Sequence, residues 1–200
     1  MKVNGIEIQE HFIPLTNKTS RPGIKRIPTY ITIHNTGNAR DTANARMHTT
    51  YVDTHPGYIS WHYSVDDIEI YQEMPDEEIA YHAGTKPGND QSIGIEICET
   101  GNYAKAEENA IALTTYLMRK HNIPIAKVVP HQFWSGKYCP HIILRKGWGK
   151  FKDRIALRFA VEQIAARVPG GLDISLWSGT NTALKQRWID TLLIKIGGIL

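Results

Sequence analysis

Residues 92–99 read SIGIEICE, and this stretch indicates the fold more clearly than any other part of the chain. Isoleucine fills every second position, at Ile93, Ile95 and Ile97, and small or polar residues fill the positions between them. Successive side chains of a β-strand point to opposite faces, so this alternation predicts a strand whose isoleucine face is buried.

Residues 29–34 repeat the alternation and predict a second strand, with His34 at its carboxyl end and the turn-prone sequence NTGN directly after it. Residues 104–121 carry an apolar residue on every turn and predict a helix. The remaining expected elements are a helix at 41–54, a hairpin of residues 58–65 and 68–72, a polar loop at 82–91, and a strand at 127–129. Strands that alternate with helices predict an α/β domain, with a central mixed β-sheet flanked by helices.

The C-terminal part divides into a long helix and a short tail. An amphipathic helix is expected over residues 150–168, and Pro169, Gly170 and Gly171 end it. These signals predict a main domain of residues 1–168 and a helical tail of residues 169–200. A helix of about 15 residues is marginal alone in water, so the tail is expected to contact the domain, a second copy of the chain or another surface.

Composition excludes several classes of protein. The chain has 200 residues, 42% of them hydrophobic, which suits one globular domain with a core of its own. No stretch has the roughly 20 apolar residues of a membrane-spanning helix, and the first residues do not resemble a secretory signal. Residues 1–140 carry 13 basic and 16 acidic side chains, against 10 and 4 in residues 141–200. This modest basic excess is more typical of a solvated face, and no nucleic-acid partner is expected.

Three residues stand out as candidate metal ligands: His34, His131 and Cys139. Two imidazoles and a thiolate form a three-ligand zinc site that leaves the fourth position open, which is the catalytic arrangement. Taken singly, each residue is more often part of a core or a surface than a ligand. The prediction of one zinc ion per chain therefore rests on the set.

Glu96 is the second candidate, because a carboxylate inside an apolar strand loses several kcal/mol unless something compensates for its burial. It could pair with Lys or Arg, it could face water at a sheet edge, or it could act as a general base next to the metal. Glu99 is expected on the opposite face and is the weaker candidate. Cys98 is expected to be a small core residue, and His48 is expected at the surface because it has no partner pattern.

The motifs YITIHNT, WHYSVDD, AYHAG, SIGIEICE and HQFWSGKYCPH resemble, in order and spacing, those of the type 2 N-acetylmuramoyl-L-alanine amidases, in particular their phage endolysin and bacillary autolysin branch. The resemblance covers about residues 28–150. It implies a zinc-dependent hydrolase that cleaves the bond between N-acetylmuramic acid and L-alanine in bacterial peptidoglycan.

The resemblance also implies roles for individual residues. His34, His131 and Cys139 would hold zinc, Glu96 would be the catalytic carboxylate, and Lys137 would donate to the developing oxyanion. Two further histidines, His62 and His82, either line the substrate groove or are hydrogen-bonded structural residues. The chain departs from some relatives at Trp61, where those relatives have a tyrosine before the histidine of the hairpin, so no role of a tyrosine hydroxyl is carried over.

Two other functions fit the same resemblance. One is a non-catalytic peptidoglycan-binding module, although such relatives typically lack the third metal ligand, which Cys139 supplies here. The other is a cytoplasmic amidase that recycles soluble muropeptides, and these usually have aspartate at that position. Without a signal sequence, a wall-lysing enzyme would be cytoplasmic when made and would act on the wall after its release.

Overall fold

The computed structural model of the chain describes residues 1–167. A seven-stranded mixed sheet forms its centre, in the order β1-β2-β5-β4-β6-β3-β7. The strands are β1 (Lys2–Val3), β2 (Ile6–Glu10), β3 (Tyr30–Asn35), β4 (Tyr63–Val65), β5 (Ile70–Gln72), β6 (Ser92–Ile97) and β7 (Val128–Pro130). The helices are α1 (Ala45–Thr54), α2 (Lys86–Gln91), α3 (Tyr103–His121), α4 (Gln132–Ser135), α5 (His141–Lys146) and α6 (Trp148–Arg167), with a short 3-10 turn at Ile125–Lys127.

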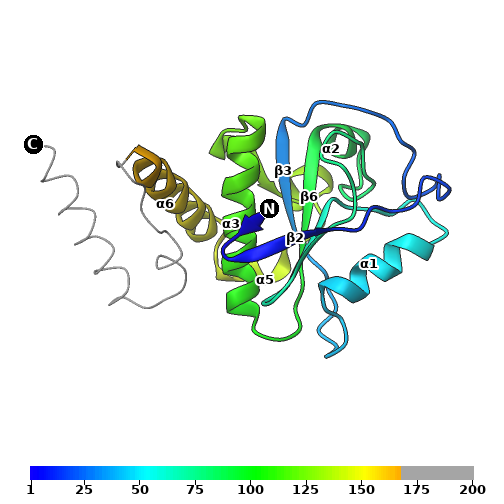
Figure 1. Ribbon diagram of the computed structural model, residues 1–200, viewed down its shortest axis with the longest axis horizontal. Coiled ribbons are helices and arrows are strands. Elements are labelled where there is room, and N and C mark those ends of the chain that lie inside the picture. Colours follow the sequence, from blue (N-terminus) through cyan, green and yellow to red (C-terminus); the bar gives the residue numbers. More distant parts are fainter. Residues whose placement is uncertain (168–200) are drawn as a thin grey trace, which may run out of the picture.

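One face of the sheet carries the main hydrophobic core. The isoleucines of β3 and β6 point to this face, where they are fully buried against Ala106, Ala110, Leu113 and Leu117 of α3. Helix α6 packs outside α3, so the layers on this side run from the sheet to α3 and then to α6 (Figure 1). The predicted burial of the isoleucine face is therefore confirmed.

The opposite face of β3, β4 and β6 is polar, and it is only partly covered. Helix α1 packs over β4 and β5 on the side of the sheet away from α3 (Figure 1). Strands β4, β6, β3 and β7 are all parallel to their neighbours in this part of the sheet, so their carboxyl ends lie along one edge. In open α/β sheets, ligands bind at such an edge.

The predicted central mixed sheet flanked by helices is confirmed, with differences at the boundaries. The first helix begins at Ala45 rather than 41, because Asn44 caps it by accepting a hydrogen bond from the Met47 N–H. The expected loop at 82–91 contains α2, which Thr85 caps in the same way and which carries a proline in its first turn. The tail at 169–200 lies outside the described residues, and the division after residue 168 stays a prediction.

Among the helices of residues 1–167, none combines the length and the apolar composition that crossing a bilayer requires.

Candidate metal and catalytic site

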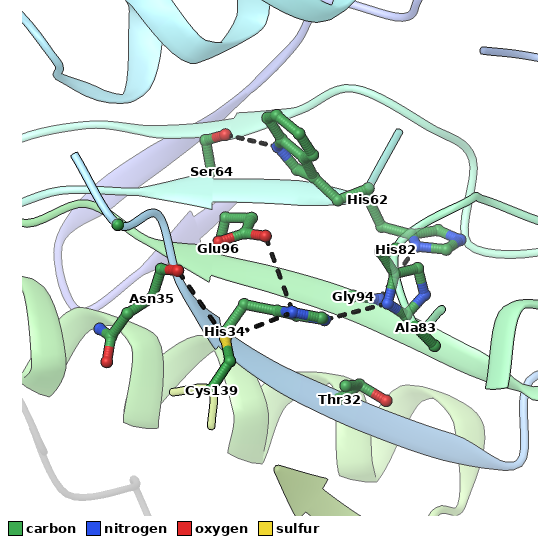
Figure 2. A network of polar contacts seen from close by, with 12 residues as sticks. Thr32, His34, Asn35, His62, Ser64, His82, Ala83, Gly94, Glu96 and Cys139 are labelled. Carbon is green, nitrogen blue, oxygen red and sulfur yellow. Dashed lines mark hydrogen bonds and ion pairs between the residues drawn. The ribbon is translucent and has the colours of Figure 1, made fainter. Parts of the chain in front are cut away.

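Three adjacent strands place polar side chains in one row on the open face of the sheet. His34 on β3 lies opposite Glu96 on β6, and Glu96 lies opposite Ser64 on β4. The distance from His34 Nδ1 to Glu96 Oε1 is 3.7 Å. Figure 2 shows His34 between this carboxylate, the Cys139 thiol and the His82 ring. Strand pairing alone thus brings together two residues that are 62 positions apart in the sequence.

The hydrogen bonds around His34 determine which ring nitrogen is free. His82 Nε2 lies 3.1 Å from the Ser92 carbonyl, which can only accept, so this nitrogen carries the proton. His82 Nδ1 is then an acceptor for His34 Nε2, 3.0 Å away. His34 Nδ1 is left with its lone pair, and it points to Cys139 Sγ at 3.9 Å. In metal sites the second ring nitrogen of a ligating histidine is usually held by a hydrogen bond, and here His82 is the acceptor.

The segment after β7 supplies the other two candidate ligands. His131 follows the last residue of β7, and the chain returns at Cys139, whose carbonyl accepts from the Gln132 N–H at 3.0 Å. The potential ligand atoms of His34, His131 and Cys139 all lie within 4.8 Å of one another. These three residues therefore form a group that could hold a metal ion.

The ring nitrogens of His131 lack, among the described residues, the hydrogen-bond partners that a buried imidazole needs. Both of its ring nitrogens are buried, and within residues 1–167 neither makes a hydrogen bond of normal geometry, although the Ala83 backbone lies close enough to influence the ring. A buried polar group without a partner costs about 1–3 kcal/mol. A metal ion bound to one of these nitrogens would remove part of that cost, so the donor set fits a bound cation.

Burial controls the ionisation of all three candidate ligands. It lowers the pKa of His34 well below its usual value, with further lowering by the neighbouring histidines, and it lowers the pKa of His131 as well. Both rings are thus neutral and able to coordinate. Burial also raises the pKa of the Cys139 thiol to about 12, chiefly because a thiolate there would lose its hydration. A divalent cation supplies the charge that a buried thiolate needs.

Glu96 occupies the position expected of a proton acceptor beside the metal group. Burial raises the pKa of its carboxyl to about 8, and the positive charge of Lys137 partly opposes that rise. The Oε2 atom is buried without a partner. Within residues 1–167, Glu96 forms no ion pair with Lys or Arg, and its strand lies in the middle of the sheet. The two structural alternatives to a functional role are therefore not realised.

The two further histidines differ in their contacts. His82 lies on the cavity wall, and Gly94 makes room for it, since a Cβ at that position would come within 2.8 Å of the His82 ring. His62 has both nitrogens engaged by the protein: Nδ1 accepts from the Gly94 N–H, and Nε2 donates to the Glu78 carbonyl, each at 3.0 Å. These bonds favour the structural alternative for His62.

A cavity of about 850 Å³ opens above the metal group. Glu96, Lys137 and the three candidate ligands lie in its lining, whereas Glu99 instead accepts from the Gly37 N–H at 2.6 Å. Several other lining residues were not predicted from the sequence, namely Asn38, Arg40, Met47, Tyr51, Tyr58 and Tyr81. They come from the loop after β3, from α1, and from the segments before β4 and after β5; of these residues, only Tyr81 falls within a family motif, AYHAG.

His48 was expected at the surface, and this expectation is wrong. His48 is only 6% exposed, and it lines the cavity on the side of α1. The signal was present in the sequence, because Ala45, His48, Thr49 and Val52 form the buried stripe of α1 with the spacing of a helical face.

Trp61 contributes no free polar group to the cavity. Its indole N–H donates to Ser64 Oγ at 2.8 Å, and the residue is 5% exposed. The ring packs with Val52 and Met74 in a small core beneath α1. Trp61 therefore supports the wall of the site and offers no hydroxyl group at this position.

Comparison with known proteins gives consistent results. The sequence model of the family described as N-acetylmuramoyl-L-alanine amidase matches residues 24–142. The N-acetylmuramoyl-L-alanine amidase XlyA of Bacillus subtilis (strain 168) is 41% identical over 202 residues, which cover 98% of this chain and 67% of XlyA. CwlH of the same organism, an amidase of the same name, is 45% identical over 156 residues, covering 76% of this chain and 62% of CwlH. The chain thus spans about two thirds of the length of these relatives.

Solved structures show the same relationship. The catalytic domain of XlyA superimposes with a TM-score of 0.72 at 47% identity, covering 75% of this chain and 99% of that domain. The structure of PlyL gives a TM-score of 0.69 at 39% identity, covering 75% of this chain and 97% of PlyL.

Proposed function

The chain belongs to the N-acetylmuramoyl-L-alanine amidase family, and from this we propose that it hydrolyses the amide bond between N-acetylmuramic acid and L-alanine in bacterial peptidoglycan, with one zinc ion at His34, His131 and Cys139. The observation that supports this best is the placement of Glu96 beside the three candidate ligands, with an unpartnered carboxylate oxygen. A structural metal site would need no buried acid at this point.

The donor set favours zinc over other ions. Two imidazole nitrogens and one thiolate suit zinc, whereas magnesium and calcium prefer oxygen ligands. When bound, zinc would supply a Lewis acid that polarises a carbonyl and makes water more acidic. Cys139 as a thiolate and two neutral imidazoles would leave a net positive charge for that purpose.

Glu96 moves the proton in the reaction. Its carboxylate accepts a proton from the attacking water while the water oxygen bonds to the lactyl carbonyl carbon. The same carboxyl then gives that proton to the alanine nitrogen as the C–N bond breaks. One water is consumed, and the products are a lactyl carboxylic acid and a free α-amino group. The raised pKa of Glu96 suits a group that must both take up and release a proton.

Lys137 stabilises the charge that appears on the carbonyl oxygen. It lies on the cavity lining with Glu96 and Cys139, and its ammonium group is close enough to influence the pKa of both. A cation held at the position where negative charge develops lowers the barrier, because the charge exists only in the transition state and the intermediate.

Mass spectrometry of digested cell walls tests the proposed reaction. Purified walls incubated with the zinc-loaded protein should gain free amino groups on L-alanine while their glycan strands stay intact. New reducing sugar ends, or cleavage within the peptide stem, would contradict the assignment. Unchanged walls combined with tight peptidoglycan binding would indicate a binding module, and cleavage of soluble anhydro-muropeptides alone would indicate a recycling enzyme.

A further inference from the structure

His48 is a buried histidine in the wall of the catalytic cavity that the proposed reaction does not use. It lies on α1 and shares the cavity with His34, Glu96 and Cys139. A polar side chain on the wall of a ligand cavity, away from the reacting atoms, usually fixes the orientation of the ligand.

Hydrogen bonding determines which nitrogen of His48 faces a ligand. Nδ1 lies 2.8 Å from the Asn44 carbonyl oxygen, which can only accept, so Nδ1 carries the proton. Cys98 Sγ lies on the same side of the ring, 3.7 Å from Nδ1. Nε2 then keeps its lone pair, and among residues 1–167 it has no hydrogen-bond partner. Burial lowers the pKa of His48, which keeps this acceptor neutral.

The position of His48 relative to the reaction follows from β6. Cys98 directly follows this strand and continues its backbone pairing, since its N–H donates to the Val65 carbonyl at 2.9 Å. Residues two apart on a strand share a face and are about 6.6 Å apart. Glu96 on β6 and Cys98 directly after the strand are such a pair, and His48 contacts the second of them. An extended peptide covers the same length with about two residues.

We propose that Nε2 of His48 accepts a hydrogen bond from a peptide N–H of the substrate's stem, about two residues from the bond that is cleaved. This inference rests on the proposed function for the identity of the ligand. A peptide stem offers N–H donors along its length, and an acceptor without a protein partner inside the groove matches that chemistry. His48 would then recognise the stem and leave the chemical step to other residues.

Two substitutions separate this role from a purely structural one. In His48→Asn, the side-chain NH2 can replace Nδ1–H on the Asn44 carbonyl, but no acceptor reaches the position of Nε2. In His48→Gln, the longer side chain can bring its oxygen to the position of Nε2, while the bond to Asn44 is lost. Recognition of the stem predicts that Gln is the better replacement, and a structural role predicts that Asn is.

Binding of a free stem tetrapeptide to the full-length, zinc-loaded protein is the first measurement. We expect the dissociation constant to rise about tenfold in His48→Asn, the usual cost of one lost hydrogen bond in a buried site, and to stay within about threefold in His48→Gln. The opposite ranking, equal binding by all three proteins, or no binding to the wild type would overturn the proposal. No bond is cleaved in this experiment, so its result does not depend on catalysis. If the wild type binds the peptide but fails to cut walls, the proposed function is contradicted and the proposal for His48 is not.

Kinetics with two muramyl substrates is the second measurement. For N-acetylmuramoyl-tetrapeptide, His48→Asn should raise KM about tenfold and change kcat less than about twofold, because the contact is the same in the ground and transition states. For N-acetylmuramoyl-L-alanine, which lacks the second residue of the stem, the two variants should match the wild type. An equal penalty on both substrates would place the contact at the sugar and overturn the assignment to the stem.

Discussion

His34 and Glu96 lie directly opposite each other on β3 and β6, with 3.7 Å between Nδ1 and Oε1. Their separation is set by the pairing of two buried parallel strands, whose isoleucines face the core on the other side. A shift of one residue in this pairing would turn the side chains of one strand to the opposite face. The same hydrophobic pattern that fixes the fold therefore fixes the distance between a candidate metal ligand and the proposed base.

Replacing Glu96 by Gln should remove activity while preserving the metal. Gln keeps the size of the side chain but cannot accept a proton, so cleavage of walls should fall by at least about 100-fold. Zinc content should stay at one per chain, since Glu96 is not one of the three candidate ligands. Near-normal turnover in a zinc-loaded variant would show that another group moves the proton.

Replacing Gly94 by Ala should weaken metal binding without touching a ligand. The new Cβ would come within 2.8 Å of the His82 ring, and a displaced His82 could no longer hold the Nε2 proton of His34. Loss of such a supporting bond typically lowers metal affinity about 10- to 100-fold. Gly149→Ala is the matched control, because a Cβ there meets nothing within 4 Å. Competition with a zinc chelator measures both variants, and equal affinities would contradict the role of His82.

Asp76 should make the fold sensitive to acid. Its carboxylate is buried, which by itself raises the pKa, but bonds from His121, Lys120 and Tyr63 outweigh burial and lower the pKa below its usual value. A carboxyl with a lowered pKa in the folded state stabilises the protein above its unfolded pKa of about 3.9, and this contribution is lost as the pH falls below that value.

Asp76→Asn tests this contribution. It should reduce the free energy of unfolding at pH 7 by about 3 kcal/mol, because Lys120 and His121 lose the buried carboxylate that they contact. The loss should shrink as the pH falls below about 4, because the carboxyl of the unfolded wild type becomes protonated there and the stabilisation by the folded carboxylate declines. Denaturant unfolding at several pH values provides the comparison, and a loss that is constant with pH would argue against an ionised Asp76.

Truncation after Gly171 should separate chemistry from association. All the proposed site residues lie before Pro140, so the shortened chain should keep its zinc and its activity on a soluble muropeptide. Wall binding or oligomeric mass should change, because the removed residues carry an apolar stripe with basic neighbours. A folded, shortened chain that loses activity on the soluble substrate would place the tail in the active site.

The sequence predicted the parts of the fold that depend on regular patterns. Alternating isoleucines predicted β3 and β6, and a helical stripe predicted α3. Helix α2 was missed because Pro87 and Gly88 are typical of loops, although a proline is tolerated in the first turn of a helix. The helix forms because the Thr85 side chain caps its first turn by accepting from the Gly88 N–H.

The site was less predictable where it depends on contacts between distant residues. The metal group and Glu96 could be named from residue types and family motifs. The engagement of His62 by Gly94 and Glu78 could not, because strand pairing and a loop bring these three residues together. His48 was missed for a different reason: no motif surrounds it, although helical spacing places it on the buried face of α1 with Ala45, Thr49 and Val52.

Removal and return of zinc tests the central claim most directly. Protein freed of metal by a chelator should release no amino groups from cell walls, and one equivalent of zinc should restore the full rate. His34→Ala, His131→Ala and Cys139→Ala should bind zinc poorly and recover little, because each lacks one of three protein ligands. Full release of L-alanine amino groups by metal-free protein, or undiminished zinc binding in any of the three variants, would contradict the account.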